Sequence, residues 1–171
     1  YQNAGATRRR GLEASWSKAL RENLHAQATY TWLDARYSDG FLTCTATPCA
    51  VANVAIPGGN RIPGIARSVL YAALAWTPPQ GWRGGIESRM LSRVYVNDTN
   101  SDAASGHAIA SANVGYVARF GMLELTGFAR ADNLFARKYA GSVIVNEGNA
   151  RYFEPAPGRT WTAGVTGSVT F

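Results

Sequence analysis

The chain has 171 residues, 46% of them hydrophobic, and a formal net charge of +6. This length allows one domain with a sizeable core, and the absence of any run of about 18 apolar residues excludes a transmembrane helix. Most of the positive charge comes from arginines dispersed along the chain without clustered stacking aromatics, so we expect no nucleic-acid partner. The sequence begins at Tyr1, without Met and without a signal peptide, which suggests a segment of a longer protein.

Seven segments alternate apolar and polar residues with the period of two that is typical of β-strands. In chain order we expect strands at about 7–20, 24–37, 67–77, 82–96, 108–120, 122–133 and 160–171. The connections between these strands alternate between short polar turns and long irregular loops, and no long segment has a helical period. The sequence therefore predicts an all-β fold with antiparallel, up-and-down strands.

The last of these segments shows most clearly that the apolar face could either pack into a protein core or face lipid. From Thr160 to Phe171, odd positions carry apolar residues and glycine, and even positions carry Thr, Ser and Gly. In a soluble sandwich the apolar face would be core, whereas in an outer-membrane barrel it would face lipid. This segment alone leaves both alternatives open.

Strand length, connection pattern and charge placement favour lipid. Strands of about 11 to 15 residues exceed the usual 5 to 6 of globular proteins and suit a tilted span of about 9 to 11. Alternating short and long connections are typical of outer-membrane barrels. Charged residues of the strands fall on the polar phase: Glu13, Glu87, Arg89, Arg93, Arg119, Glu124, Arg130 and Asp132. The main exception is Lys18, which lies near a short turn where a long side chain can reach the interface.

All five tryptophans fall on the apolar phase, at two levels. Trp32 and Trp161 lie toward the long-loop rim, and Trp16, Trp76 and Trp82 toward the short-turn rim. Two interfacial aromatic girdles have this pattern. Bacterial barrels have an even number of strands, and unpaired strand edges are too costly in hydrocarbon. We therefore expect these seven strands to be the end of a larger transmembrane barrel.

Four motifs carry a family resemblance. The segment Ala131–Tyr139 resembles the D-N-L-F signature near the C-terminus of TonB-dependent outer-membrane receptors, and the terminal Phe171 matches their aromatic end signal. Ala66 and Ala136 depart from the family pattern, where Pro and Asp are usual. The other matching segments, in family order, are Asn3–Glu13, Tyr30–Ala35 and Asn60–Arg67.

This resemblance implies that residues 1–171 are the last seven strands of a barrel of about 22 strands in a Gram-negative outer membrane. The plug domain and the segment that contacts the TonB complex would lie outside this sequence. The barrel assembly machinery would read Phe171, whose ring we expect at the periplasmic interface, toward lipid. The implied function is uptake of a scarce anionic ligand, most simply a ferric siderophore.

Two alternatives to siderophore uptake remain. The long loop, at 141–149 and 152–159, is similar to the branch that includes pyrroloquinoline quinone receptors and some siderophore receptors, so that redox cofactor is the alternative ligand. A soluble β-sandwich adhesin module is the alternative of another class.

No enzyme constellation, resident cofactor or metal site is expected. His25 and His107 fall on opposite rims, and neither has a nearby Ser nucleophile with an acidic partner. Cys44 and Cys49 lie close together without a nearby His, so a small disulfide on the oxidising side is expected and zinc is not.

The arginines of the polar phase have two interpretations. They can form a structural network with Glu87, Glu124 and plug carboxylates, or they can bind ligand, since guanidinium groups suit carboxylates and catecholates. Asn146, Glu147 and Asn149 can bind ligand or serve the turns of their own loop. The candidate ligand-binding residues are Arg61, Arg93, Tyr95, Asn146, Glu147, Asn149, Arg151 and Tyr152.

Overall fold

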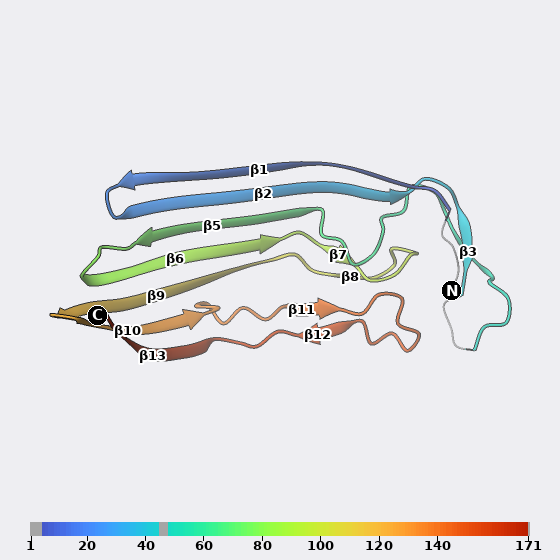
Figure 1. Cartoon of the computed structure of the whole chain (residues 1–171). Helices are drawn as coiled ribbons and strands as arrows, with labels where there is room; N and C mark the ends of the chain where they lie inside the picture. Colours follow the sequence, from blue (N-terminus) through green and yellow to red (C-terminus); the bar gives the residue numbers. More distant parts are fainter. Residues whose placement is uncertain (1–4, 45–47, 171) are drawn as a thin grey trace.

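The computed structural model describes residues 5–44 and 48–170, most of which belong to one antiparallel sheet (Figure 1). Consecutive strands of this sheet are hydrogen-bonded neighbours, so the topology is up-and-down, as the sequence predicts. The described part of the chain contains no helix that is long and apolar enough to cross a membrane. In sheet order the strands are β1 (Thr7–Arg21), β2 (Leu24–Tyr37), β5 (Ser68–Trp76), β6 (Gly81–Leu91), β9 (His107–Phe120), β10 (Leu123–Asp132) and β13 (Thr160–Val169).

Three short hairpins extend the sheet at its long-loop end, opposite the tight turns (Figure 1). Their strands have only two to four residues, too few to produce a detectable period, so the sequence predicts only loops here. The hairpins also correct the predicted end of the fourth strand, because Val94 and Tyr95 leave the sheet and pair with Ala104 and Ala103. The hairpins are β3 (Phe41–Thr43) with β4 (Val54–Ile56), β7 (Val94–Tyr95) with β8 (Ala103–Ala104), and β11 (Ala140–Val143) with β12 (Phe153–Pro155).

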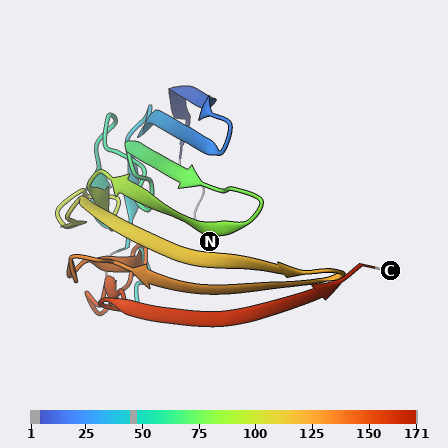
Figure 2. The ribbon, with the colours of Figure 1, turned by 90° about the vertical axis from the view of Figure 1, so that its left-hand side faces the viewer.

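The register between strands assigns each residue to one of two faces. The outer face carries the apolar phase, and its large side chains stay exposed: 67% for Trp82, 70% for Trp161 and 78% for Val165. A soluble sandwich would bury such residues as its core. A sheet that curves, as Figure 2 shows, and leaves this face uncovered has instead the arrangement of the wall of a larger barrel.

Burial is greatest where the long connections pack together. Val96 and Ile56, from two different connections, are 0% and 1% exposed. Beside them the Tyr37 hydroxyl donates to Asp98 Oδ1 at 2.6 Å, and Asn146 Nδ2 donates to Asp98 Oδ2 at 2.9 Å. One buried carboxylate therefore joins the end of β2 to two long loops and fixes the shape of this rim.

Asn133, in the D-N-L-F segment, closes the turn that follows β10. Its φ of +49° is left-handed, a conformation that asparagine tolerates better than most residues. Its Oδ1 accepts the Arg137 N–H at 2.8 Å and its Nδ2 donates to the Arg137 carbonyl at 2.9 Å. The asparagine of the motif is therefore explained by the turn that it builds.

Candidate functional site

The inner face of the sheet carries a polar network at mid-height. Arg130 Nη2 lies 2.5 Å from Glu87 Oε1 and 2.7 Å from Asp132 Oδ1. The Tyr71 hydroxyl donates to Glu87 Oε2 at 3.1 Å, so β5, β6 and β10 are linked across this face. This is the structural network expected for Arg130, with Asp132 as an additional partner.

A second ion pair lies near the short turns. Arg119 and Glu124, directly opposite each other on β9 and β10, are 2.6 Å apart. The pair is half-exposed and brackets a tight turn, so it is worth at most about 1 kcal/mol. Its height and its partner both fit the structural interpretation of Arg119.

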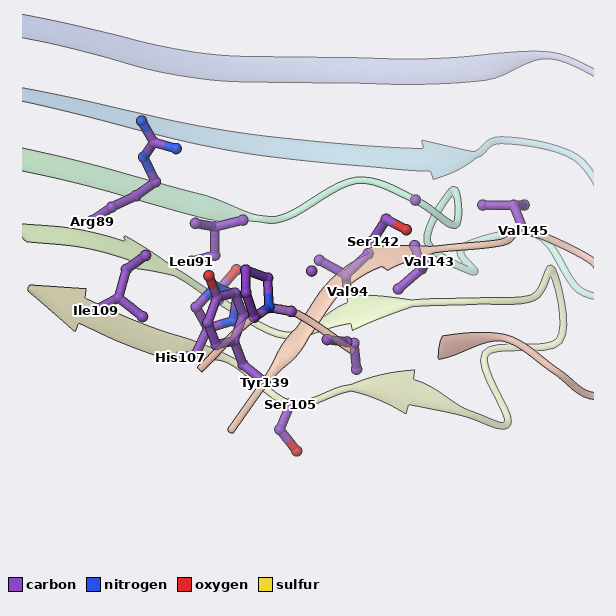
Figure 3. A pocket seen from close by; sticks show the side chains of 17 residues that line it. Arg89, Leu91, Val94, Ser105, His107, Ile109, Tyr139, Ser142, Val143 and Val145 are labelled. Atoms are coloured by element: carbon purple, nitrogen blue, oxygen red, sulfur yellow. The ribbon is translucent and has the colours of Figure 1, made fainter. Parts of the chain in front are cut away.

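A cavity of about 710 Å³ opens on the inner face at the long-loop rim, between β6, β9 and the β11 hairpin. We call it the rim cavity. Arg89, Leu91 and Ile109 line its strand side, and residues of β11 line the other, as Figure 3 shows. Its volume is in the range of small-molecule sites, about 300 to 1,000 Å³.

Two rings are stacked in the wall of the rim cavity. His107, the first residue of β9, and Tyr139, just before β11, have ring centroids 4.2 Å apart and planes inclined by 32° (Figure 3). Aromatic pairs of this kind contribute about 0.5 to 1.5 kcal/mol beyond burial of their area. The pair therefore fixes the β11 hairpin over the end of the sheet and gives the cavity a flat wall.

Arg89 is the charged residue of this cavity. It lies opposite Tyr71 and Ile109 in the register and makes no ion pair with any residue in 5–44 or 48–170. The nearest acid along β6, Glu87, is already bonded to Arg130. A guanidinium without a counter-charge in a concave site can receive an anionic group.

Three of the predicted ligand-binding residues make contacts that hold the long loops in shape. Asn146 has a φ of +55° and bonds to Asp98 through both its carbonyl oxygen and its amide. Glu147 accepts the backbone N–H groups of Asn149 at 2.8 Å and Arg151 at 2.9 Å. These N–H groups, that of Arg151 first, lower the pKa of Glu147 below its usual value. The turn-forming interpretation therefore accounts for the contacts of Glu147 and Asn149, whereas the side chain of Asn146 joins its loop to the loop that carries Asp98.

The other predicted residues are not gathered in one place. Tyr152 lines a separate cavity of about 400 Å³ between the loops, together with Asn146 and Glu147. Arg93 is exposed between β6 and β7, and Tyr95 accepts the Gly64 N–H through its carbonyl. The structure thus brings only part of the predicted set together.

Arg61 has a different environment from the rest. Its Nη2 lies 3.5 Å from Asp34 Oδ1, beside Arg36, and it lines neither of the two cavities described above. Burial and the neighbouring Arg36 and Arg67 lower its pKa. Arg61 therefore belongs to a cluster of cations away from the rim cavity.

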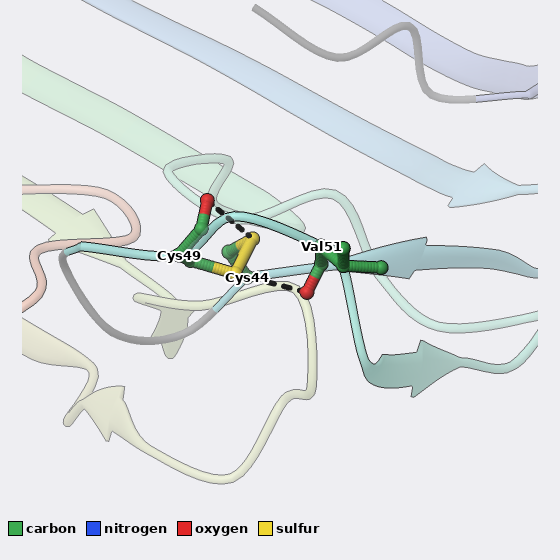
Figure 4. Close-up of a disulfide and its surroundings, with 3 residues drawn as sticks. All are labelled: Cys44, Cys49 and Val51. Atoms are coloured by element: carbon green, nitrogen blue, oxygen red, sulfur yellow. Dashed lines mark hydrogen bonds between the residues drawn. A yellow bond between two sulfur atoms is a disulfide. The ribbon is translucent and has the colours of Figure 1, made fainter.

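Cys44 and Cys49 are joined by a disulfide in the loop between β3 and β4, with Cα atoms 6.0 Å apart (Figure 4). Cys44 lines the same cavity between the loops as Asp98 and Glu147. In the described residues no three His, Cys, Asp or Glu side chains gather into a metal-binding group. Phe171, the predicted assembly signal, lies outside the described residues.

The sequence did not identify the rim cavity. The polar phase places Arg89 near the long-loop end of β6, so its position could be inferred. The stacking of His107 on Tyr139 joins residues 32 positions apart through a hairpin without a sequence period. No local signal indicates that contact.

The fold and this face pattern define the chain as part of the wall of a large outer-membrane-type barrel. The sequence model described as "TonB dependent receptor-like, beta-barrel" matches residues 1–134. The chain therefore belongs to the TonB-dependent receptor β-barrel family, and its seven strands form part of a larger barrel.

Solved structures have the same fold. The siderophore receptor PiuA from Acinetobacter baumannii is similar at a TM-score of 0.77 and 17% identity, over 95% of this chain and 22% of that one. The ferric citrate transporter FecA gives 0.74 and 18%, over 94% and 24%. The copper transporter OprC gives 0.67 and 20%, over 96% and 23%. The chain thus spans under a quarter of each of these proteins.

Proposed function

We propose that the chain forms the last seven strands of a TonB-dependent receptor in a Gram-negative outer membrane, and that this receptor imports a ferric siderophore. Family membership and the apolar outer face with its tryptophans support the location. Import, coupling to the TonB complex through a plug domain and insertion by the barrel assembly machinery are properties of the whole receptor. These three properties are proposed and not observed, because the chain covers less than a quarter of the similar receptors.

The rim cavity is the observation from which we propose an anionic ligand. It combines the guanidinium of Arg89, which has no ion-pair partner in the described part of the chain, with the flat wall of His107 and Tyr139. Arginine offers a planar fork for carboxylate or catecholate oxygens, and an aromatic wall suits the flat groups that such chelators carry. The ligand is therefore proposed to be anionic and to contact the receptor first at this rim.

The remaining candidates divide by their contacts. Arg93, Tyr95, Arg151 and Tyr152 are proposed to extend the surface that the ligand meets. Asn146, Glu147 and Asn149 are proposed to hold the loops in shape, because their polar atoms are engaged within the rim. Pyrroloquinoline quinone, a planar carboxylated cofactor, would suit the same guanidinium and flat wall, and is the second candidate ligand.

A growth-rescue panel tests the function. A strain that depends on the full-length receptor is given single ferric siderophores, ferric citrate or pyrroloquinoline quinone as its only source of iron or cofactor. Growth on one ferric chelate supports the proposal. Growth rescued by the quinone alone would replace the ligand while keeping the receptor class.

Substitution of Arg89 tests the site. Arg89→Gln should weaken binding of the rescuing ligand about 10- to 100-fold, the usual effect of losing a hydrogen bond to a charged group. Arg83→Gln is the matched control, since Arg83 lies on the same face of β6 about 20 Å away along the strand. Calorimetric titration of the purified receptor measures both. An equal loss of affinity in the two variants would show that the rim cavity is not part of the binding site.

A further inference from the structure

Charged residues occupy the outer face of β1 and β2 beyond the tryptophan level. Trp32 lies on the outer face, and the register from there to the end of β2 is unbroken. Alternation therefore puts Asp34 and Arg36 on the same face as Trp32. The register pairs Asp34 with Arg10 and Arg36 with Arg8. Two cross-strand rows of charge thus follow directly on the apolar surface.

A third segment adds two more arginines. The chain that enters β5 pairs with the end of β2 at Arg36 and Arg61. The guanidinium of Arg67 lies over the Trp32 ring, 5.3 Å from its centroid. We call this set the outer arginine cluster, which consists of Arg8, Arg10, Arg36, Arg61 and Arg67.

One buried carboxylate organises the cluster. The side chain of Asp34 is only 6% exposed, and its oxygens lie 2.9 Å from Arg36, 3.5 Å from Arg61 and 3.8 Å from Arg10. Arg36 also donates to the Gly59 carbonyl at 2.7 Å, which fixes its plane. Three of the five guanidinium groups contact this carboxylate, and the five arginines together with Asp34 carry a formal net charge of +4.

The cluster keeps capacity for an anion. The Arg10 side chain is 65% exposed and that of Arg36 is 33% exposed. Burial and repulsion from Arg36 and Arg67 lower the pKa of Arg61, which records how closely the cations are crowded. An anion that bridges them would relieve this repulsion.

The height of the cluster places it in the headgroup layer. Asp34 and Arg36 follow Trp32 by two and four residues, which is about 5 and 10 Å further from the membrane centre in a strand tilted by about 45°. The polar layer on each side of the hydrocarbon is about 5 to 8 Å thick, so Asp34 and its partner Arg10 lie within it, and Arg36 and Arg8 lie at its outer edge. Because these side chains point away from the barrel interior, imported ligand does not pass them.

We propose that the outer arginine cluster binds the phosphate groups of an anionic lipid in the outer leaflet, with Trp32 beside the top of its acyl chains. Arginine binds phosphate through paired N–H groups, and several adjacent arginines suit a headgroup with more than one phosphate. This inference rests on the proposed outer-membrane location, but not on the identity of the imported ligand.

Lipid titration into the purified full-length receptor, followed by native mass spectrometry, tests the proposal. The probes are bisphosphorylated lipid A, the same lipid without its phosphates, and inorganic phosphate. Arg10→Gln is compared with Arg9→Gln, which removes the same charge from the adjacent position of β1 on the inner face. Arg10 is chosen because its contact with Asp34 is the longest of the three, at 3.8 Å, so folding should be preserved.

The bisphosphorylated lipid should bind, and Arg10→Gln should weaken it about fivefold, the effect expected for one basic residue near an anionic surface. Arg9→Gln should leave it unchanged, and salt should weaken binding. Equal binding of the dephosphorylated lipid, equal losses in both variants, or equally tight binding of inorganic phosphate would each overturn the proposal. The ligand growth panel, run on the same variants, shows separately whether the receptor function stands.

Discussion

Replacement of Asn133 tests the turn that follows β10. The side chain is buried and makes two good hydrogen bonds, both to the backbone of Arg137. Each such bond contributes about 1 kcal/mol net. The left-handed backbone at φ +49° costs alanine about 1 to 2 kcal/mol more than glycine, whereas asparagine tolerates it better than most residues. The two contributions can be separated by the choice of replacement.

Asn133→Gly removes the hydrogen bonds but tolerates the backbone, so it should destabilise the receptor by about 2 kcal/mol. Asn133→Ala should cost about 3 to 4 kcal/mol because it also strains the backbone. Asn133→Asp keeps the acceptor for the Arg137 N–H and should cost about 1 kcal/mol. Urea unfolding of the full-length receptor in detergent measures the series. If Asn133→Ala were no more destabilising than Asn133→Gly, the left-handed backbone at this position would not strain a residue with a Cβ.

Three further outcomes are expected. Cys44 and Cys49 should resist thiol labelling in unreduced, denatured protein, and the bridge should contribute about 2 kcal/mol; full labelling at both positions would exclude it. The lowered pKa of Glu147 means that its stabilising effect is complete above its usual value of 4.5 and is lost as pH falls through the lowered one. The amide of Arg151 should therefore lose protection from hydrogen exchange only in acid, and a Glu147→Gln variant should show no such step. Phe171→Ala should reduce the amount of receptor inserted far more than its melting temperature, since one ring is worth roughly 1 to 3 kcal/mol; unchanged outer-membrane levels with weaker ligand binding would contradict this.

The main sheet could be predicted because the two faces of each strand have different environments, so that apolar and polar residues alternate along the sequence. In β13, for example, Trp161, Ala163 and Val165 alternate with polar residues, and the register confirms that they share a face. A period of two repeated seven times, with connections of alternating length, leaves little choice of topology. The turn role of Asn133 belongs to a motif of the family, but only the structure gives its physical reason.

The rim was less predictable because its contacts are long-range. The hydrogen bond from Tyr37 to Asp98 joins residues 61 positions apart, and the β7–β8 hairpin that carries Asp98 is too short to show a period. The sorting of charge by phase also fails at this end: Arg10 and Asp34 lie on the outer face because β1 and β2 continue beyond the hydrocarbon. The expectation that charged residues lie on the inner face therefore applies only to the part of each strand that crosses the hydrocarbon.

Inner-face packing gives another exception. Phe128 lies on the polar phase of β10, where its ring covers Gly164, and a Cβ added at Gly164 would lie 2.8 Å from the Phe128 ring. An aromatic residue on the inner face is accommodated by the glycine opposite it. The sequence shows both residues, but only the register shows that they meet.

The claim that the outer face meets lipid is tested most directly by a spin-label scan along β13. Single cysteines are introduced at positions 161 to 168 of the full-length receptor, with Cys44 and Cys49 replaced by Ser, and the receptor is placed in lipid bilayers. Collision rates with oxygen, which concentrates in lipid, should peak at positions 161, 163, 165 and 167, and those with a water-soluble nickel chelate at positions 162, 164, 166 and 168. Equal access of the nickel chelate to both sets would show that the apolar face does not meet lipid, and would contradict the account.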